Sequence, residues 1–117
     1  MAHTRRWTSW GLCALVAGVF GVADAEAEPL SPRAQALFGQ TCAVCHVKPG
    51  LGVPVLGVEA DWIERRGRGI DALVASTVRG VGQMPPLGTC GACTESDLRA
   101  LVGFLAGLDP AETEGAP

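Results

Sequence analysis

The chain has 117 residues, a formal net charge of −3 and 48% apolar residues. This length allows one domain of ordinary size. The acidic balance argues against nucleic acid as a partner.

Residues 1–25 have the pattern of a secretory signal peptide. Two arginines precede an apolar run at residues 11–23, and residues 23–25 fit a small-residue cleavage site. The run has about 13 residues, whereas a membrane-spanning helix needs ~20. We therefore predict export through the general secretory route to the periplasm, a mature chain that starts near Glu26, and no stable membrane insertion after cleavage.

The mature part is small for a self-sufficient hydrophobic core, and a buried prosthetic group would supply the missing core. It carries seven basic against eleven acidic side chains, so it remains acidic after cleavage. Its four cysteines form two C-x-x-C pairs, at residues 42–45 and 90–93, in an oxidising compartment. We expect one folded domain over residues 26–108 and a flexible acidic tail over residues 109–117.

The first predicted helix begins at Ser31-Pro32. Serine is a favoured N-cap, and proline is tolerated in the first helical turn. The helical pattern continues through Leu37 and Phe38, which we expect to make core contacts, and it runs towards Cys42.

The pentapeptide CAVCH, at residues 42–46, has the form of a covalent c-type haem attachment site. In a helix, Cys42, Cys45 and His46 would share one face because they lie three and four residues apart. The two thiols can then bond to the haem vinyl groups, and the imidazole can serve as the fifth iron ligand. The motif predicts one covalent haem c.

Residues 47–60 contain glycines and prolines without a sustained period, which indicates a loop. Pro54 is a candidate acceptor within it, because its carbonyl is free to accept the ring N–H of His46 and orient the imidazole. The alternative is an ordinary loop proline.

A short helix with Asp61 as its cap is predicted around Trp62 and Arg65, and a second over residues 70–81. Trp62 is a candidate to pack against the haem and donate to a propionate, and a simple core aromatic is the alternative. Arg65 belongs to a basic cluster with Arg66 and Arg68, any one of which could hold a propionate or be solvated surface.

Met84 is the candidate sixth ligand of the iron. It is the only methionine besides the initiator, it lies in a proline-stiffened loop, and the mature chain has no second histidine. A thioether ligand favours the reduced iron and suits electron transfer. With His46 on the other side, the iron would have both axial positions filled.

If thioethers consume the first cysteine pair, Cys90 and Cys93 are left to form their own disulfide. That bond would staple the end of the Met84 loop to the start of the last helix. Thr94 and Asp97 resemble a capping box at this start. An apolar stripe over residues 97–108 then predicts a helix that packs on the first one.

Together, the motifs CAVCH, GVP, DWIERRGRGIDAL and QMPPLGTCGAC and a closing helix resemble the bacterial cytochrome c5 group of class I monohaem cytochromes c. The resemblance covers residues 33–108. It implies an all-α class I cytochrome c fold with helices packed around one covalent haem c, the first and last helices crossing.

The resemblance further implies haem attachment at Cys42 and Cys45, axial ligation by His46 and Met84, and a Cys90–Cys93 disulfide. It also supports Pro54 as the acceptor for His46. Lys48 is the only lysine, which departs from the lysine ring around the haem edge of many class I cytochromes. We therefore expect a mostly apolar, transient contact with redox partner proteins.

The resulting hypothesis is a periplasmic one-electron carrier without enzymatic activity of its own, present as a monomer or weak dimer. Two alternatives stay open. The domain could be the haem subunit of a larger oxidoreductase, or the four cysteines could form a zinc site. The 44 residues between Cys45 and Cys90 are long for a zinc-binding pair arrangement.

Overall fold

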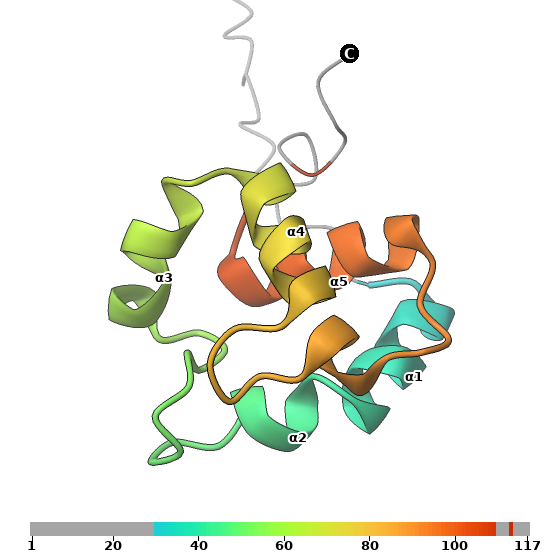
Figure 1. The fold of residues 1–117 in the computed structure, drawn as a ribbon, viewed down its shortest axis with the longest axis horizontal. Helices are drawn as coiled ribbons and strands as arrows, with labels where there is room; N and C mark the ends of the chain where they lie inside the picture. Colours follow the sequence, from blue (N-terminus) through green and yellow to red (C-terminus); the bar gives the residue numbers. More distant parts are fainter. Residues whose placement is uncertain (1–29, 110–112, 114–117) are drawn as a thin grey trace, which may run out of the picture.

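The computed structural model describes residues 30–109 and Thr113, so the predicted signal peptide and most of the predicted acidic tail lie outside the described residues. The described part consists of helices joined by loops, with no β-strand (Figure 1). The all-α prediction is therefore confirmed. Within these residues, no helix is both long enough and apolar enough to cross a membrane.

Within residues 30–109, five α-helices and one 3-10 helix follow one another. They are α1 (Pro32–Gln40), α2 (Ala43–His46), α3 (Glu59–Arg66), α4 (Ile70–Arg79), η1 (Pro86–Thr89) and α5 (Glu95–Ala106).

Helices α1 and α5, which contact each other although they lie far apart in sequence, begin as the sequence predicts. The Ser31 hydroxyl accepts a hydrogen bond from the Ala34 amide at 3.2 Å, and Pro32 occupies the first turn of α1. Thr94 and Asp97 form a complete capping box at the start of α5. Helix α5 ends two residues earlier than predicted, because Gly107 adopts the left-handed conformation that terminates helices.

Helix α5 packs against α1 and α4 and carries the centre of the core. Leu101 and Ala106 are each 1% exposed, and Ala34 of α1 is 3% exposed. The rings of Phe38 and Phe104 meet edge to face, with centroids 5.4 Å apart. The predicted packing of the first helix on the last is thus confirmed, and it fixes the position of the chain that enters α2.

Two further helix boundaries differ from the prediction. Asp61 is not a cap, because α3 already begins at Glu59 and Val58 is the capping residue. Its carboxylate instead accepts a hydrogen bond from the Val55 amide at 2.9 Å. Helix α4 stops at Arg79 instead of residue 81, because Gly80 turns the chain with φ of 82°, a conformation that favours glycine.

Candidate haem site

Helix α2 brings Cys42, Cys45 and His46 together within one helical turn. Cys42 precedes the helix with helical backbone angles, and its carbonyl accepts the His46 amide at 2.9 Å. Both thiols are free, with Cys42 half-buried and Cys45 exposed, whereas His46 is 8% exposed. The local fold therefore presents two reachable nucleophilic sulfurs beside one buried imidazole.

The loop after α2 closes back on His46 and sets its orientation. The His46 Nδ1 lies 2.6 Å from the Pro54 carbonyl oxygen, and the His46 carbonyl accepts the Leu56 amide at 2.7 Å. Because a carbonyl can only accept, Nδ1 carries the proton and Nε2 keeps its lone pair. This arrangement directs Nε2 as the available ligand atom.

Helix α3 fixes this loop through two hydrogen bonds to the backbone of Val55. The Val55 amide donates to Asp61, and its carbonyl accepts the Trp62 indole N–H at 2.8 Å. The single indole hydrogen of Trp62 is thus bonded to the Val55 carbonyl in this structure, and donation from Trp62 to a haem propionate stays a prediction. Trp62 is 6% exposed, and its ring centroid lies 6.2 Å from that of His46, so it packs beside the ligand residue.

Replacing Trp62→Phe should lower the free energy of unfolding by about 1–2 kcal/mol, because the part-buried Val55 carbonyl loses its donor while most of the ring volume is kept. Denaturant unfolding of the holoprotein measures the change. Ile63→Ala, at a side chain that is 63% exposed, is the control and should change stability by about 0.5 kcal/mol at most. Equal stability of Trp62→Phe and the natural protein would show that this bond does not hold the loop.

The basic cluster lies on and after α3, and its members have different partners. Arg65 is exposed and donates to the Asp61 carbonyl of its own helix. Arg66 pairs with Glu59 and donates to the Ala106 carbonyl, and Arg68 donates to the Ser76 hydroxyl. No contact among the described residues joins Arg65 to Cys42, Cys45, His46 or Met84, so its role at a propionate stays a prediction.

Met84 is presented by a tight turn between α4 and η1. Val81 and Met84 exchange two backbone hydrogen bonds of 3.0 and 2.8 Å, which close a four-residue turn. Gly80 precedes this turn, and a Cβ atom added to it would lie 2.7 Å from the Met84 carbonyl oxygen. The half-buried Met84 side chain reaches towards Gly88 of η1. Figure 1 shows this turn and α2 at the same, lower end of the molecule.

The second cysteine pair is bonded in the structure, with a disulfide between Cys90 and Cys93. Two of the four sulfurs that the zinc alternative requires are thus consumed. The described residues also contain no group of three or more His, Cys, Asp or Glu side chains that could hold a metal ion. The four-cysteine zinc alternative is therefore wrong.

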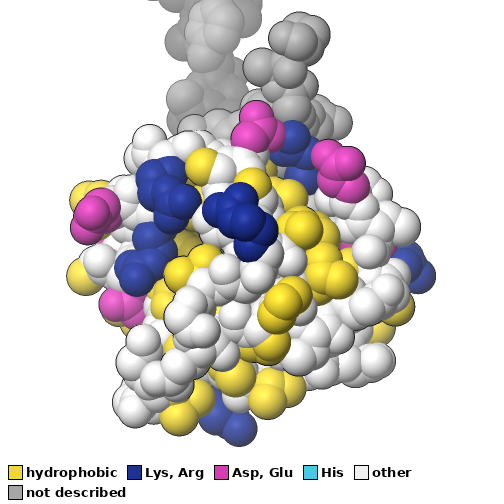
Figure 2. All heavy atoms as spheres, in the orientation of Figure 1, with side chains coloured by type: hydrophobic (Ala, Val, Ile, Leu, Met, Phe, Trp, Pro, Cys, Tyr) yellow, Lys and Arg dark blue, Asp and Glu magenta, His cyan; other side chains and the backbone are white. Residues whose placement is uncertain are grey.

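The residues present fit a covalently bound haem. Free thiols, a directed imidazole nitrogen and a thioether are the donor set that c-type haem uses. The segments that carry them expose apolar side chains that suit a porphyrin, namely Val44 (53% exposed), Val47 (45%), Leu51 (49%), Val78 (44%) and Val81 (57%). Hydrophobic side chains also gather over the lower and central part of the face in Figure 2.

A separate pocket of about 140 Å³ lies between the loop before α3, α3 itself and the end of α5. Trp62, Arg66 and Phe104 line it, but none of the thiols, His46 or Met84 does. It is therefore distinct from the haem site.

Sequence reasoning missed three contributors to the site. Val55 acts through its backbone, so its residue type carries no signal. Gly80 matters because of close backbone packing, for which the only sequence signal is a glycine two residues before another glycine ahead of Met84. Asp61 is predicted as a helix cap, because its contact with the Val55 amide six residues earlier depends on how the loop turns back.

Comparisons with known proteins agree with this site. Residues 30–105 match the family model described as cytochrome c oxidase, cbb3-type, subunit III. The chain is 35% identical over 74 residues to cytochrome c5 of Ectopseudomonas mendocina, a match that covers 62% of this chain and 85% of that protein. It is 38% identical over 69 residues to cytochrome c5 of Azotobacter vinelandii, covering 57% of this chain and 83% of that protein.

A solved structure is also similar. It is a chain from a crystal structure described as an electron transfer complex of nitrite reductase with cytochrome c. The TM-score is 0.60 at 35% sequence identity, and the match covers 68% of this chain and 96% of that chain.

The helical fold and the thiol–imidazole site define a c-type cytochrome. This chain belongs to the class I monohaem cytochromes c, in the cytochrome c5 group. It carries covalently attached haem c and is a haem electron carrier.

Proposed function

We propose that this protein is a periplasmic one-electron carrier whose haem iron is ligated by His46 and Met84, and that it is not itself an enzyme. The observation that best supports this proposal is the hydrogen bond from His46 Nδ1 to the Pro54 carbonyl, because it leaves Nε2 as the ring nitrogen available to the iron. Covalent attachment through Cys42 and Cys45 accompanies this ligation. Haem c supplies the one-electron redox centre when bound.

The chain's own residues keep the two ligands in place. His46 is held by the loop that α3 clamps at Val55, and Met84 is held by the turn that packs on Gly80. Rigid support on both sides favours the same ligand set in both oxidation states. With both axial positions filled, no open metal position is left for a substrate, which favours electron transfer over catalysis.

Export supports the periplasmic part of this proposal. The expected signal peptide lies at residues 1–25. The Cys90–Cys93 disulfide would persist in the oxidising periplasm, while the thiols of the other cysteine pair would be consumed there by haem attachment. Cell fractionation should recover the haem protein in the periplasmic extract with an N-terminus near Glu26. Recovery in the membrane fraction with an intact N-terminus would contradict it.

The cofactor and its ligands are tested on the purified protein. The mature mass should include one haem, the reduced pyridine haemochrome should have a c-type spectrum, and the ferric protein should be six-coordinate and low-spin with a sulfur-to-iron charge-transfer band. A mature mass without haem would contradict the attachment. Rapid binding of peroxide or other small ligands to the native iron would contradict the closed, non-enzymatic site.

A second candidate is a haem subunit of a larger oxidoreductase. It is favoured by the matching family model, whose description is that of an oxidase subunit, and by the structural relative described as part of an electron transfer complex. Size-exclusion chromatography of a periplasmic extract with haem detection separates the two. A haem peak at monomer or dimer size supports a free carrier, and co-migration with a larger enzyme supports a subunit.

Redox partner proteins are the proposed binding partners in either case. Lysine is almost absent, and exposed valines and leucine flank the candidate haem site. We expect contact through this apolar surface, with little dependence of the electron-transfer rate on salt.

A further inference from the structure

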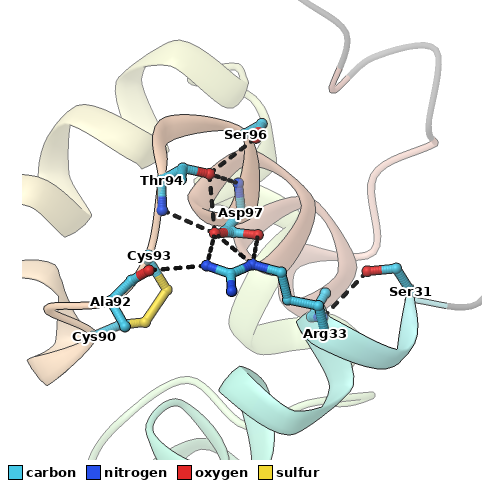
Figure 3. Close-up of polar contacts among 9 residues, drawn as sticks. Ser31, Arg33, Cys90, Ala92, Cys93, Thr94, Ser96 and Asp97 are labelled. Atoms are coloured by element: carbon cyan, nitrogen blue, oxygen red, sulfur yellow. Dashed lines mark hydrogen bonds and ion pairs between the residues drawn. A yellow bond between two sulfur atoms is a disulfide. The ribbon is translucent and has the colours of Figure 1, made fainter.

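Arg33 joins two parts of the chain that lie far apart in sequence. Its guanidinium makes a forked contact with the Asp97 carboxylate of α5, with N–O distances of 3.0 to 3.3 Å. The same group donates to the Ala92 carbonyl at 3.0 Å, inside the ring closed by the Cys90–Cys93 disulfide (Figure 3). Arg33 thus bridges α1 to the segment that follows Met84.

The segment from Gly80 to Thr94, which we call the methionine strap, is a continuous series of tight turns. After the Val81–Met84 turn, the Gly88 amide donates to Pro85 at 3.0 Å, and the Cys90 amide donates to Leu87 at 3.0 Å. Pro85 and Pro86 restrict the backbone, and the disulfide closes the far end. Ala92 and Met84 therefore belong to one segment that local hydrogen bonds, two prolines and a disulfide restrain.

Arg33 lies on α1, which leads directly into α2, the helix that carries His46. Helix α1 leads into α2 across a single turn, in which the Thr41 amide donates to Leu37 at 3.1 Å and the Val44 amide donates to Thr41 at 3.2 Å. The α1–α2 unit and the methionine strap therefore meet at the Arg33 guanidinium. With haem bound, their relative position would set how closely the Met84 thioether could approach the iron.

We propose that Arg33 is a positioning residue for the sixth iron ligand, which it acts on by fixing the methionine strap against helix α1. The inference rests on the proposed ligation by Met84 and goes beyond it. When the Arg33 contacts are lost, the strap should separate from α1 more often, and Met84 should leave the iron more readily.

Arg33 and Asp97 stay charged down to acidic pH, so the contact between them persists at neutral pH. The Arg33 hydrogen bond and the Thr94 amide hold the pKa of Asp97 down at about 2. The carboxylate therefore stays charged until the pH falls from about 4 towards 2, and the contact is lost only in that acid range. Arg33 is 59% exposed, so the contact is sensitive to salt.

The test measures how easily imidazole replaces Met84 on the ferric holoprotein, by titrating away the sulfur-to-iron charge-transfer band. Arg33→Gln should raise the apparent affinity for imidazole about two- to fivefold, the range typical of exposed ion pairs. Arg33→Lys keeps the charge without the fork and should have an intermediate effect. High salt should shift the natural protein towards Arg33→Gln and leave that variant unchanged.

Arg99→Gln is the matched control. Arg99 also pairs with carboxylates, those of Asp71 and Glu95, and donates to a backbone carbonyl, that of Thr113, but it does not contact the strap. Its imidazole affinity should equal that of the natural protein. Equal affinities for Arg33→Gln and the natural protein, or an equal rise in Arg33→Gln and Arg99→Gln, would overturn the inference. A natural protein that lacks the charge-transfer band would instead overturn the Met84 assignment itself.

Discussion

Replacing Met84→Ala is expected to abolish the sulfur-to-iron charge-transfer band and to lower the reduction potential on the order of 0.1 V or more, within the ~0.8 V that axial ligands span. The thioether stabilises the reduced iron, and alanine offers no donor atom in its place. Residues 26–117 contain no other methionine and no second histidine to take over. Absorption spectroscopy of the ferric protein and redox titration measure both effects.

Gln83→Ala is the control for this variant, because Gln83 is exposed and lies in the same turn. It should keep the band and the potential. A Met84→Ala protein with an unchanged band and potential would show that another group is the sixth ligand. The haem attachment through Cys42 and Cys45 would be unaffected by that result.

Replacing Gly80→Ala is expected to lower the free energy of unfolding by about 2–4 kcal/mol and to weaken the charge-transfer band. The Gly80 backbone has φ of 82° and ψ of 155°, a region that is almost restricted to glycine. The added Cβ would also lie 2.7 Å from the Met84 carbonyl oxygen and 3.0 Å from the Pro86 nitrogen. The strap must move away, and Met84 moves with it.

Gly91→Ala tests whether this effect is specific to the position. Gly91 lies in the same strap, but its φ is not positive, and an added Cβ would meet no atom within 4 Å. Its stability should change by about 0.5 kcal/mol at most, and its band should persist. If both variants were equally stable, the close packing of Gly80 on the Met84 backbone would not matter for the fold.

Much of the candidate site could be predicted because its chemistry is local in sequence. CAVCH places both thiols and the imidazole within five residues, and a single helical turn is enough to gather them. The starts of α1 and α5 depend on residues three apart at most, so Ser31 and Thr94 could be recognised as caps. Pro54 could be named because its carbonyl lies a short loop away from His46.

Contacts that depend on how a loop or turn folds back could not be predicted in the same way. The indole of Trp62 was expected at a propionate, but the fold brings the Val55 carbonyl to its N–H first. A donor takes the acceptor that packing places nearest, and residue type alone does not specify that acceptor. The end of α4 was also misplaced, because the role of Gly80 depends on backbone atoms of the Met84 segment.

By itself, then, the sequence indicated covalent haem attachment and named His46 and Met84 as the candidate iron ligands. The tertiary structure alone decided how these groups are held, through α3 on Val55, Gly80 against the Met84 turn and Arg33 across 59 and 64 residues to Ala92 and Asp97. The physical reason is that ligand atoms are chosen by side-chain chemistry, whereas their positions depend on contacts that form only when the chain folds back and its segments pack together.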